Sequence, residues 1–156
     1  MKKTLLLLLA LVLLTACSKS IDDEKTADRI EHDELAIHKA SYTGDIDLVK
    51  ELLESPQDVD VRDSFGGTAL HAAMFQDNME IVSLLIENGY DVNAQGSSNG
   101  FTPLHDAVWA GNIEAAKLLL ESGADLSIKN KDGQTPLDKA KDANDSIYDL
   151  FTKDDN

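Results

Sequence analysis

The sequence is poor in basic residues and has one cysteine among its 156 residues. It holds 14 basic against 29 acidic residues, a formal net charge of −15. No basic patch is visible, which argues against nucleic acid as a partner and against a domain lying flat on anionic lipid. A lone cysteine has no partner for an intramolecular disulfide, so we expect the stability of the domain to come from packing alone.

The residue patterns of several enzyme classes are also missing. No serine lies in a Gly-x-Ser-x-Gly elbow, and no glycine-rich loop has the form that cradles phosphate. The acidic runs at 22–24 and 154–155 lack the spacing of a calcium loop. The sequence therefore predicts no catalytic site, no metal site, no cofactor and no small-molecule substrate. An enzyme with unrecognised chemistry stays as a minor alternative.

One apolar run stands at the amino terminus. Residues 4–14 are nearly all leucine, about half the length that a membrane-spanning helix needs. Lys2 and Lys3 precede the run, and Leu14-Thr15-Ala16-Cys17 follows it. A short basic segment, a short apolar segment and small residues before a cleavage point are typical of a secretory signal peptide.

The tetrapeptide Leu14-Thr15-Ala16-Cys17 resembles the lipobox of bacterial lipoproteins. The resemblance implies cleavage before Cys17, a diacylglyceryl group on its sulfur and an acyl chain such as palmitate on the new amino terminus. Several acyl chains together anchor a protein durably to a membrane. Ser18 is not the aspartate associated with inner-membrane retention, so the resemblance implies an outer-membrane protein facing the periplasm. The alternative is an ordinary secreted protein with a chance cysteine.

The rest of the chain divides into a polar segment and an internally repeated one. Residues 17–32 read as the lipidated terminus and a solvated tether after a signal peptide at 1–16. Beyond them, the segment TALHAA at 68–73 returns as TPLHDA 34 residues later and as TPLDKA 33 residues after that. Looking back by 33 residues gives the degenerate LAIHKA at 35–40. A second block, DIDLVKELL at 45–53, recurs with the same period.

These co-registered blocks resemble the ankyrin repeat, from about Asp33 to Phe151. The resemblance implies an all-α solenoid of stacked helix-turn-helix units with short finger-like turns. A single helix pair cannot bury its own apolar face, so neighbouring units must stack into one core. We expect a domain over 33–156, with units at about 33–66, 67–99 and 100–132 and a C-terminal capping unit at 133–156.

Local residue types predict where the helices begin and end. Thr68 and Thr102 can cap helix starts, and Pro103 and Pro136 suit the first helical position. The short first helices are expected to end near residues that tolerate left-handed backbone, namely Gly44, Asp77, Gly111 and Asn144. Three departures from the repeat are predicted to alter it locally. These are Leu35 in place of a capping threonine, Pro56 in place of the glycine at 89 and 123, and one extra residue within 95–100.

Three histidines, His38, His71 and His105, recur at the repeat period. Residues one repeat apart are separated by roughly 10 Å, which is too far for a shared zinc ion. In ankyrin repeats the equivalent histidine bonds to the helix start and to neighbouring turns. We therefore predict a structural role for all three.

The repeat register also predicts a binding surface. Tyr42, Phe75 and Trp109 occupy equivalent positions and should project toward the concave groove, although they could instead pack on adjacent units. Aromatic residues in a row on an open groove are typical anchors of a protein interface. Asp106 adds negative charge near Trp109, and the two form the predicted centre of the site. The remaining candidates for protein binding are Gln76, Phe65, Phe101 and Asn99.

The predicted function is a lipid-anchored protein-binding module of the bacterial envelope. The acidic surface indicates either a basic protein partner or simply good solubility. A sharper hypothesis is an immunity protein that neutralises a secreted antibacterial effector such as a phospholipase. The alternative is a periplasmic scaffold or stress-protection factor that binds an envelope enzyme.

Overall fold

The computed structural model describes residues 35–143 and 145–152, which belong to one compact unit over Glu34–Asn156. Within the described residues the secondary structure is entirely helical, as predicted. The helices are α3 (Ala36–Thr43), α4 (Ile46–Leu53), α5 (Ala69–Ala72) with the 3-10 helix η1 (Ala73–Phe75), α6 (Met79–Glu87), α7 (Pro103–Ala110), α8 (Ile113–Glu121), α9 (Pro136–Ala143) and α10 (Asp145–Thr152).

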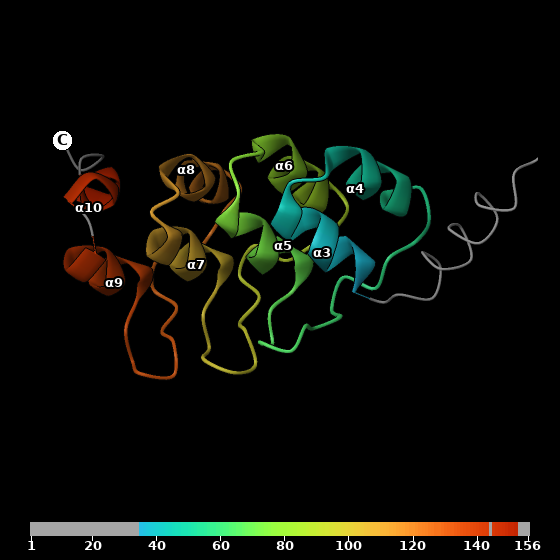
Figure 1. Cartoon of the computed structure of the whole chain (residues 1–156). Coiled ribbons are helices and arrows are strands. Elements are labelled where there is room, and N and C mark those ends of the chain that lie inside the picture. The colour runs from blue at the N-terminus through green and yellow to red at the C-terminus, as the bar shows by residue number, and fades with distance from the viewer. Residues whose placement is uncertain (1–34, 144, 153–156) are drawn as a thin grey trace, which may run out of the picture. The chain divides into compact units, whose positions relative to one another are not determined.

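The helices form two layers that run side by side along the stack (Figure 1). One layer holds α3, α5, α7 and α9, and the other holds α4, α6, α8 and α10. Each helix contacts its pair mate and the equivalent helix of the next unit. The loops between successive units project as fingers from the first layer (Figure 1).

Short-range capping explains where most helices begin. The Thr102 hydroxyl accepts a hydrogen bond from the amide of His105 at 3.4 Å, and Pro103 is the first residue of α7. The second helices α4, α6 and α8 are capped by side chains that accept a hydrogen bond from a backbone amide two or three residues ahead. These side chains belong to Asp45, Asn78 and Asn112. Each cap satisfies an amide that has no partner inside its own helix. The sequence therefore fixes helix starts through contacts within one turn.

The core lies between the two layers and continues from unit to unit. Its largest fully buried side chains include Leu70, Leu104, Ile81, Leu85 and Leu119. Burial of such a side chain contributes about 1.5–3 kcal/mol relative to exposure. Ile147 of α10 is also fully buried, and Phe151 is half-buried.

The histidines link successive units, as predicted. His71 Nδ1 accepts from the amide of Thr68 at 3.1 Å, and its Nε2 lies 3.1 Å from the carbonyl oxygen of Phe101 in the next finger. His105 makes the equivalent contacts with Thr102 and the carbonyl of Gln134. These partners select the neutral imidazole that carries its proton on Nε2.

The first histidine differs because its unit lacks the threonine. His38 Nε2 lies 3.1 Å from the carbonyl oxygen of Val61, but its Nδ1 has no hydrogen-bond partner among the described residues. Leu35 stands where Thr68 and Thr102 stand in the next units, and its side chain makes no cap. The predicted departure at the terminal unit is therefore present.

Two predicted local departures are also present. α4 ends at Leu53 with its C-cap Glu54 in right-handed backbone. Pro56 does not adopt positive φ, whereas Gly89 and Gly123 at the equivalent positions follow α6 and α8 with φ of +93° and +90°. The finger between the second and third units is closed by the amide of Gly96 donating to the carbonyl of Phe101 at 2.6 Å. In the other fingers the closing hydrogen bond spans one residue fewer, for example from the amide of Asp63 to the carbonyl of Gly67.

The expectation for Asp77 was wrong. Positive φ is confined to glycines in the described chain, and they include Gly44 and Gly111 at the ends of α3 and α7. At the equivalent place in the second unit, α5 tightens into η1 and Gln76 becomes extended, with φ −137° and ψ 166°. An aspartate adopts left-handed backbone less readily than glycine, so the helix ends by another route. Asn144 lies outside the described residues.

No helix within 35–143 and 145–152 combines the length and the apolar character needed to cross a membrane. The predicted signal peptide, Cys17 and the tether lie outside the described residues.

Candidate functional site: an aromatic groove

The three predicted aromatic residues form one continuous row on the first layer of helices. The ring centroids of Tyr42 and Phe75 lie 6.1 Å apart, and those of Phe75 and Trp109 lie 5.7 Å apart in an edge-to-face arrangement. We call Tyr42, Phe75 and Trp109 the aromatic row. Their side chains stay 60%, 39% and 67% exposed, so contact with adjacent units does not bury them.

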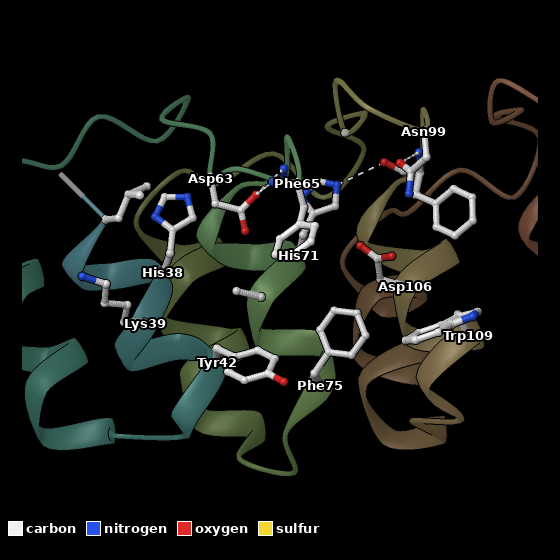
Figure 2. A pocket seen from close by; sticks show the side chains of 15 residues that line it. His38, Lys39, Tyr42, Asp63, Phe65, His71, Phe75, Asn99, Asp106 and Trp109 are labelled. Atoms are coloured by element: carbon white, nitrogen blue, oxygen red, sulfur yellow. Dashed lines mark hydrogen bonds between the residues drawn. The ribbon is translucent and has the colours of Figure 1, made fainter.

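The aromatic row borders a groove of about 690 Å³ (Figure 2). The groove extends from the row, past the small side chain of Ala72, to the fingers that carry Phe65 and Asn99. Ala72 occupies the position of Lys39 in the first unit and of Asp106 in the third. Its methyl side chain therefore leaves a hollow between neighbouring units.

Asp106 lies in this groove, one helical turn before Trp109 on α7 (Figure 2). Its carboxyl group is half-buried, and burial raises its pKa to about 7, with the nearby charge of Asp63 as a smaller cause. Two acidic groups that share a desolvated space disfavour each other's charged form. Asp106 therefore changes charge near neutral pH.

Asp63 holds the finger that carries Phe65. Its Oδ1 accepts from the amide of Phe65 at 2.9 Å and from the amide of Gly67 at 3.0 Å. The turn presents Phe65 to solvent, where 80% of the side chain is exposed. Large apolar side chains with this exposure, next to a groove, are typical of interaction surfaces.

Phe101, the other phenylalanine among the predicted binding residues, is less exposed than Phe65. Its ring stacks on the His105 imidazole with centroids 5.2 Å apart, and the Lys139 ammonium lies 5.6 Å from the ring centroid. His105 of the same unit and Lys139 of the next unit therefore cover part of Phe101, and the side chain is half-buried at the edge of the groove.

The predicted residues Asn99 and Gln76 both have structural partners. Asn99 Oδ1 accepts from the amide of Phe101 at 2.9 Å, although the side chain is exposed in the groove. The Gln76 amide group donates to the carbonyls of Ala73 at 3.1 Å and Asn78 at 3.2 Å. Gln76 also accepts from the amide of Asn78. The Gln76 side chain therefore satisfies backbone groups at the end of η1, where Asp77 does not adopt left-handed backbone.

The groove offers hydrogen-bonding and apolar contacts. His71 lines it, yet burial lowers its pKa to about 4 and both ring nitrogens are occupied within the repeat. No group of three or more potential metal ligands occurs in the chain described at 35–143 and 145–152. The arrangement suits recognition of another molecule.

Comparison with known families gives two matches. A family model described as ankyrin repeats (3 copies) matches residues 37–130, more than half of the chain. A model described as a prokaryotic membrane lipoprotein lipid attachment site matches residues 1–18, which include Cys17. No curated protein matches the chain.

Proposed function

The chain belongs to the ankyrin-repeat family and carries a prokaryotic lipoprotein attachment site, and from this premise we propose that it binds a protein partner in its aromatic groove while anchored by lipid at Cys17. Ankyrin repeats are typically protein-interaction modules without catalytic activity. In this proposal residues 1–16 are removed, 17–32 form the lipidated tether and 33–156 form the binding domain.

The observation that carries the proposal is the exposure of the aromatic row. Tyr42, Phe75 and Trp109 contact one another in series but remain between 39% and 67% exposed. Phe65 adds a further exposed ring beside the same groove. Aromatic side chains that a domain leaves uncovered dominate the binding energy of many interfaces, because a partner removes them from water.

The charge of the chain supports a basic partner. The formal net charge is −15, and cleavage before Cys17 would leave 12 basic and 29 acidic residues, near −17. An acidic surface accelerates encounter with a basic protein and repels acidic ones.

We propose that the partner is a secreted antibacterial effector, such as a phospholipase, and that this protein is its immunity factor at the outer membrane facing the periplasm. A lipid anchor would keep the groove where an incoming effector arrives, and a rigid repeat stack could block the effector by binding alone. A scaffold for an envelope enzyme uses the same groove, so the identity and number of partners distinguish the two functions.

Affinity capture with the mature, lipidated protein tests the binding proposal. Trp109→Ala and Phe75→Ala should each weaken the captured complex by more than about 1 kcal/mol, while Glu121→Ala, an exposed change on α8, should leave it intact. One stoichiometric basic partner supports immunity, and several envelope proteins support scaffolding. Equal capture by all three variants would contradict the binding proposal, and turnover by the purified protein alone would favour the enzyme alternative.

A killing assay tests the immunity proposal separately. Cells that lack this protein should be killed by siblings that secrete the effector, and the wild-type protein should restore survival. The Trp109→Ala variant should restore survival poorly. Deletion cells that resist their siblings would exclude the immunity role but not the groove as a binding site.

A further inference from the structure

The groove contains one acidic group whose position has no structural explanation. Asp106 lies on α7 in the hollow beside Ala72, close to the rings of Phe75 and Trp109 (Figure 2). In the fourth unit Asp138 lies one residue nearer its helix start than Asp106 does, and it accepts from the amide and hydroxyl of Thr135. Asp106 makes no comparable cap, because His105 already fills that role for α7.

The residue equivalent to His105 is Asp138, so the third unit carries both the capping histidine and an additional acid. Within the described residues, no donor or cation stabilises the charged form of Asp106; burial and the charge of Asp63 both act against it. A half-buried carboxylate without a partner costs stability. An acidic residue in a groove that lowers the stability of the free domain is therefore a candidate for contact with a bound ligand.

The surroundings of Asp106 define the ligand chemistry. Trp109 and Phe75 present aromatic faces and edges beside it, and Trp109 lies one turn along the same helix. Aromatic faces attract cations, and a desolvated carboxylate pairs strongly with an N–H donor that carries positive charge. A second carboxylate, Asp63, adds to the negative potential in the hollow. Anions are therefore excluded, and a cation is favoured.

We propose that the hollow between Ala72, Phe75 and Trp109 receives an arginine side chain of the protein partner, with its guanidinium group paired to the Asp106 carboxylate and stacked on the Trp109 ring. This inference rests on the proposed function, because it names the chemistry that the partner inserts into the same groove.

Arginine fits this hollow better than the other cations. Its guanidinium group is flat, presents donors as a fork to a carboxylate and is weakly hydrated, so it stacks on an indole while pairing with an acid. A lysine ammonium is more strongly hydrated and lacks the flat face. A choline headgroup has no N–H donor for Asp106. Lys39 lines the groove on α3, with α5 between it and Asp106, so the positive charge of the first unit does not occupy the hollow.

Trp109 makes this interaction directly measurable, because it is the only tryptophan in the sequence. The mature lipidated protein in detergent is titrated with acetyl-Gly-Arg-Gly-amide while tryptophan emission is recorded. Peptides with lysine or citrulline in place of arginine, and choline chloride, are titrated in parallel at equal ionic strength. We expect a saturable change with the arginine peptide, a weaker one with lysine, and none with citrulline or choline.

The matched variants are Asp106→Asn and Glu87→Gln. Each removes one negative charge, but Glu87 is exposed at the end of α6 and does not line the groove. Asp106→Asn should weaken binding of the arginine peptide at least tenfold, or about 1.4 kcal/mol, since it removes one charge of a desolvated charge pair. Glu87→Gln should leave it unchanged. Equal affinity of Asp106→Asn and wild type, or equal responses to citrulline or choline, would overturn the proposal.

Partner capture separates this inference from the proposed function. Both proposals expect loss of the partner with Trp109→Ala, and only the arginine proposal expects loss with Asp106→Asn. If Trp109→Ala loses the partner while Asp106→Asn keeps it, the arginine inference fails and the binding groove stands. If both variants keep the partner, the proposed function fails as well.

Discussion

The side-chain amide of Gln57 donates to the carbonyl oxygen of Leu52 at 2.7 Å. In the second and third units the equivalent carbonyls, of Leu85 and Leu119, instead accept from the backbone amide five residues ahead, at 3.1 Å and 2.9 Å. Those units reach this geometry through a left-handed glycine, which Pro56 cannot replace. A side chain has therefore taken over a backbone hydrogen bond where the sequence lost its glycine.

Gln57→Ala should destabilise the domain by about 1 kcal/mol, because the carbonyls of Leu52 and Ser55 lose the hydrogen bonds that the Gln57 amide donates. Urea unfolding followed by circular dichroism measures the change. Glu51→Ala, an exposed change on the same helix, is the control and should stay within about 0.5 kcal/mol of wild type. An equal effect of the two substitutions would mean that the Gln57 bond adds nothing.

A double-mutant cycle at Gln76 and Asp77 tests whether the Gln76 side chain replaces the left-handed residue at the end of the helix. Gln76→Ala should cost about 1–2 kcal/mol, since Ala73 and Asn78 lose its amide group as a partner. Asp77→Gly should restore the left-handed ending seen at Gly44 and Gly111 and so reduce the cost of Gln76→Ala. Additive effects in urea unfolding would show that the two endings do not replace each other.

The buried histidines predict lower stability in acid. His71 has a pKa of about 4 in the folded protein and an ordinary value near 6.5 when unfolded, so the unfolded state binds the extra proton between these values. Its contribution is present above pH 6.5 and is lost as the pH falls toward 4. His71→Phe should be less stable at pH 7 by about 2 kcal/mol, and its stability should fall less steeply in acid. A slope equal to that of wild type would contradict the assignment.

The raised pKa of Asp106 predicts that this residue lowers the stability of the fold as the pH rises. Its pKa is about 7 in the folded protein and near 3.8 when unfolded, so the folded state binds more protons between these values and loses stability as the pH rises through this window. Asp106→Asn should therefore raise the free energy of unfolding at pH 8, and the gain should shrink toward zero at pH 4. The neighbouring titratable groups, Asp63 and His71, are retained in both proteins. A gain that does not depend on pH would exclude the unpaired carboxylate as its cause.

Lipidation at Cys17 is tested by metabolic labelling with palmitate in a bacterial host. Cys17→Ala should abolish labelling and release the protein into the aqueous phase of a detergent partition, because no acyl chain remains. Ser18→Ala is the matched control and should keep both properties. In an enteric host, Ser18→Asp should move the labelled protein from the outer- to the inner-membrane fraction on a density gradient. Labelling of Cys17→Ala would place the lipid elsewhere.

Much of this protein followed from its sequence because the information is local or periodic. Thr102, Pro103 and the asparagine caps act within one helical turn, and the ankyrin match confirmed the all-α repeat fold. The lipobox could be recognised because it is a short local motif, and the attachment-site match confirms it. The alignment of Tyr42, Phe75 and Trp109 followed from their equal places in successive repeats.

Only the tertiary structure decided how neighbouring units complete one another. Nothing in the local pattern indicated that Gln57 and Gln76 would replace lost backbone bonds, or that His105 and Lys139 would cover Phe101 while Phe65 stayed exposed. The placement of Asp106 in one groove with Ala72, Phe75 and Trp109 likewise depends on side chains from two units. Repeat sequences specify each unit through short-range contacts, but burial and hydrogen bonding at a groove depend on atoms that adjacent units bring together.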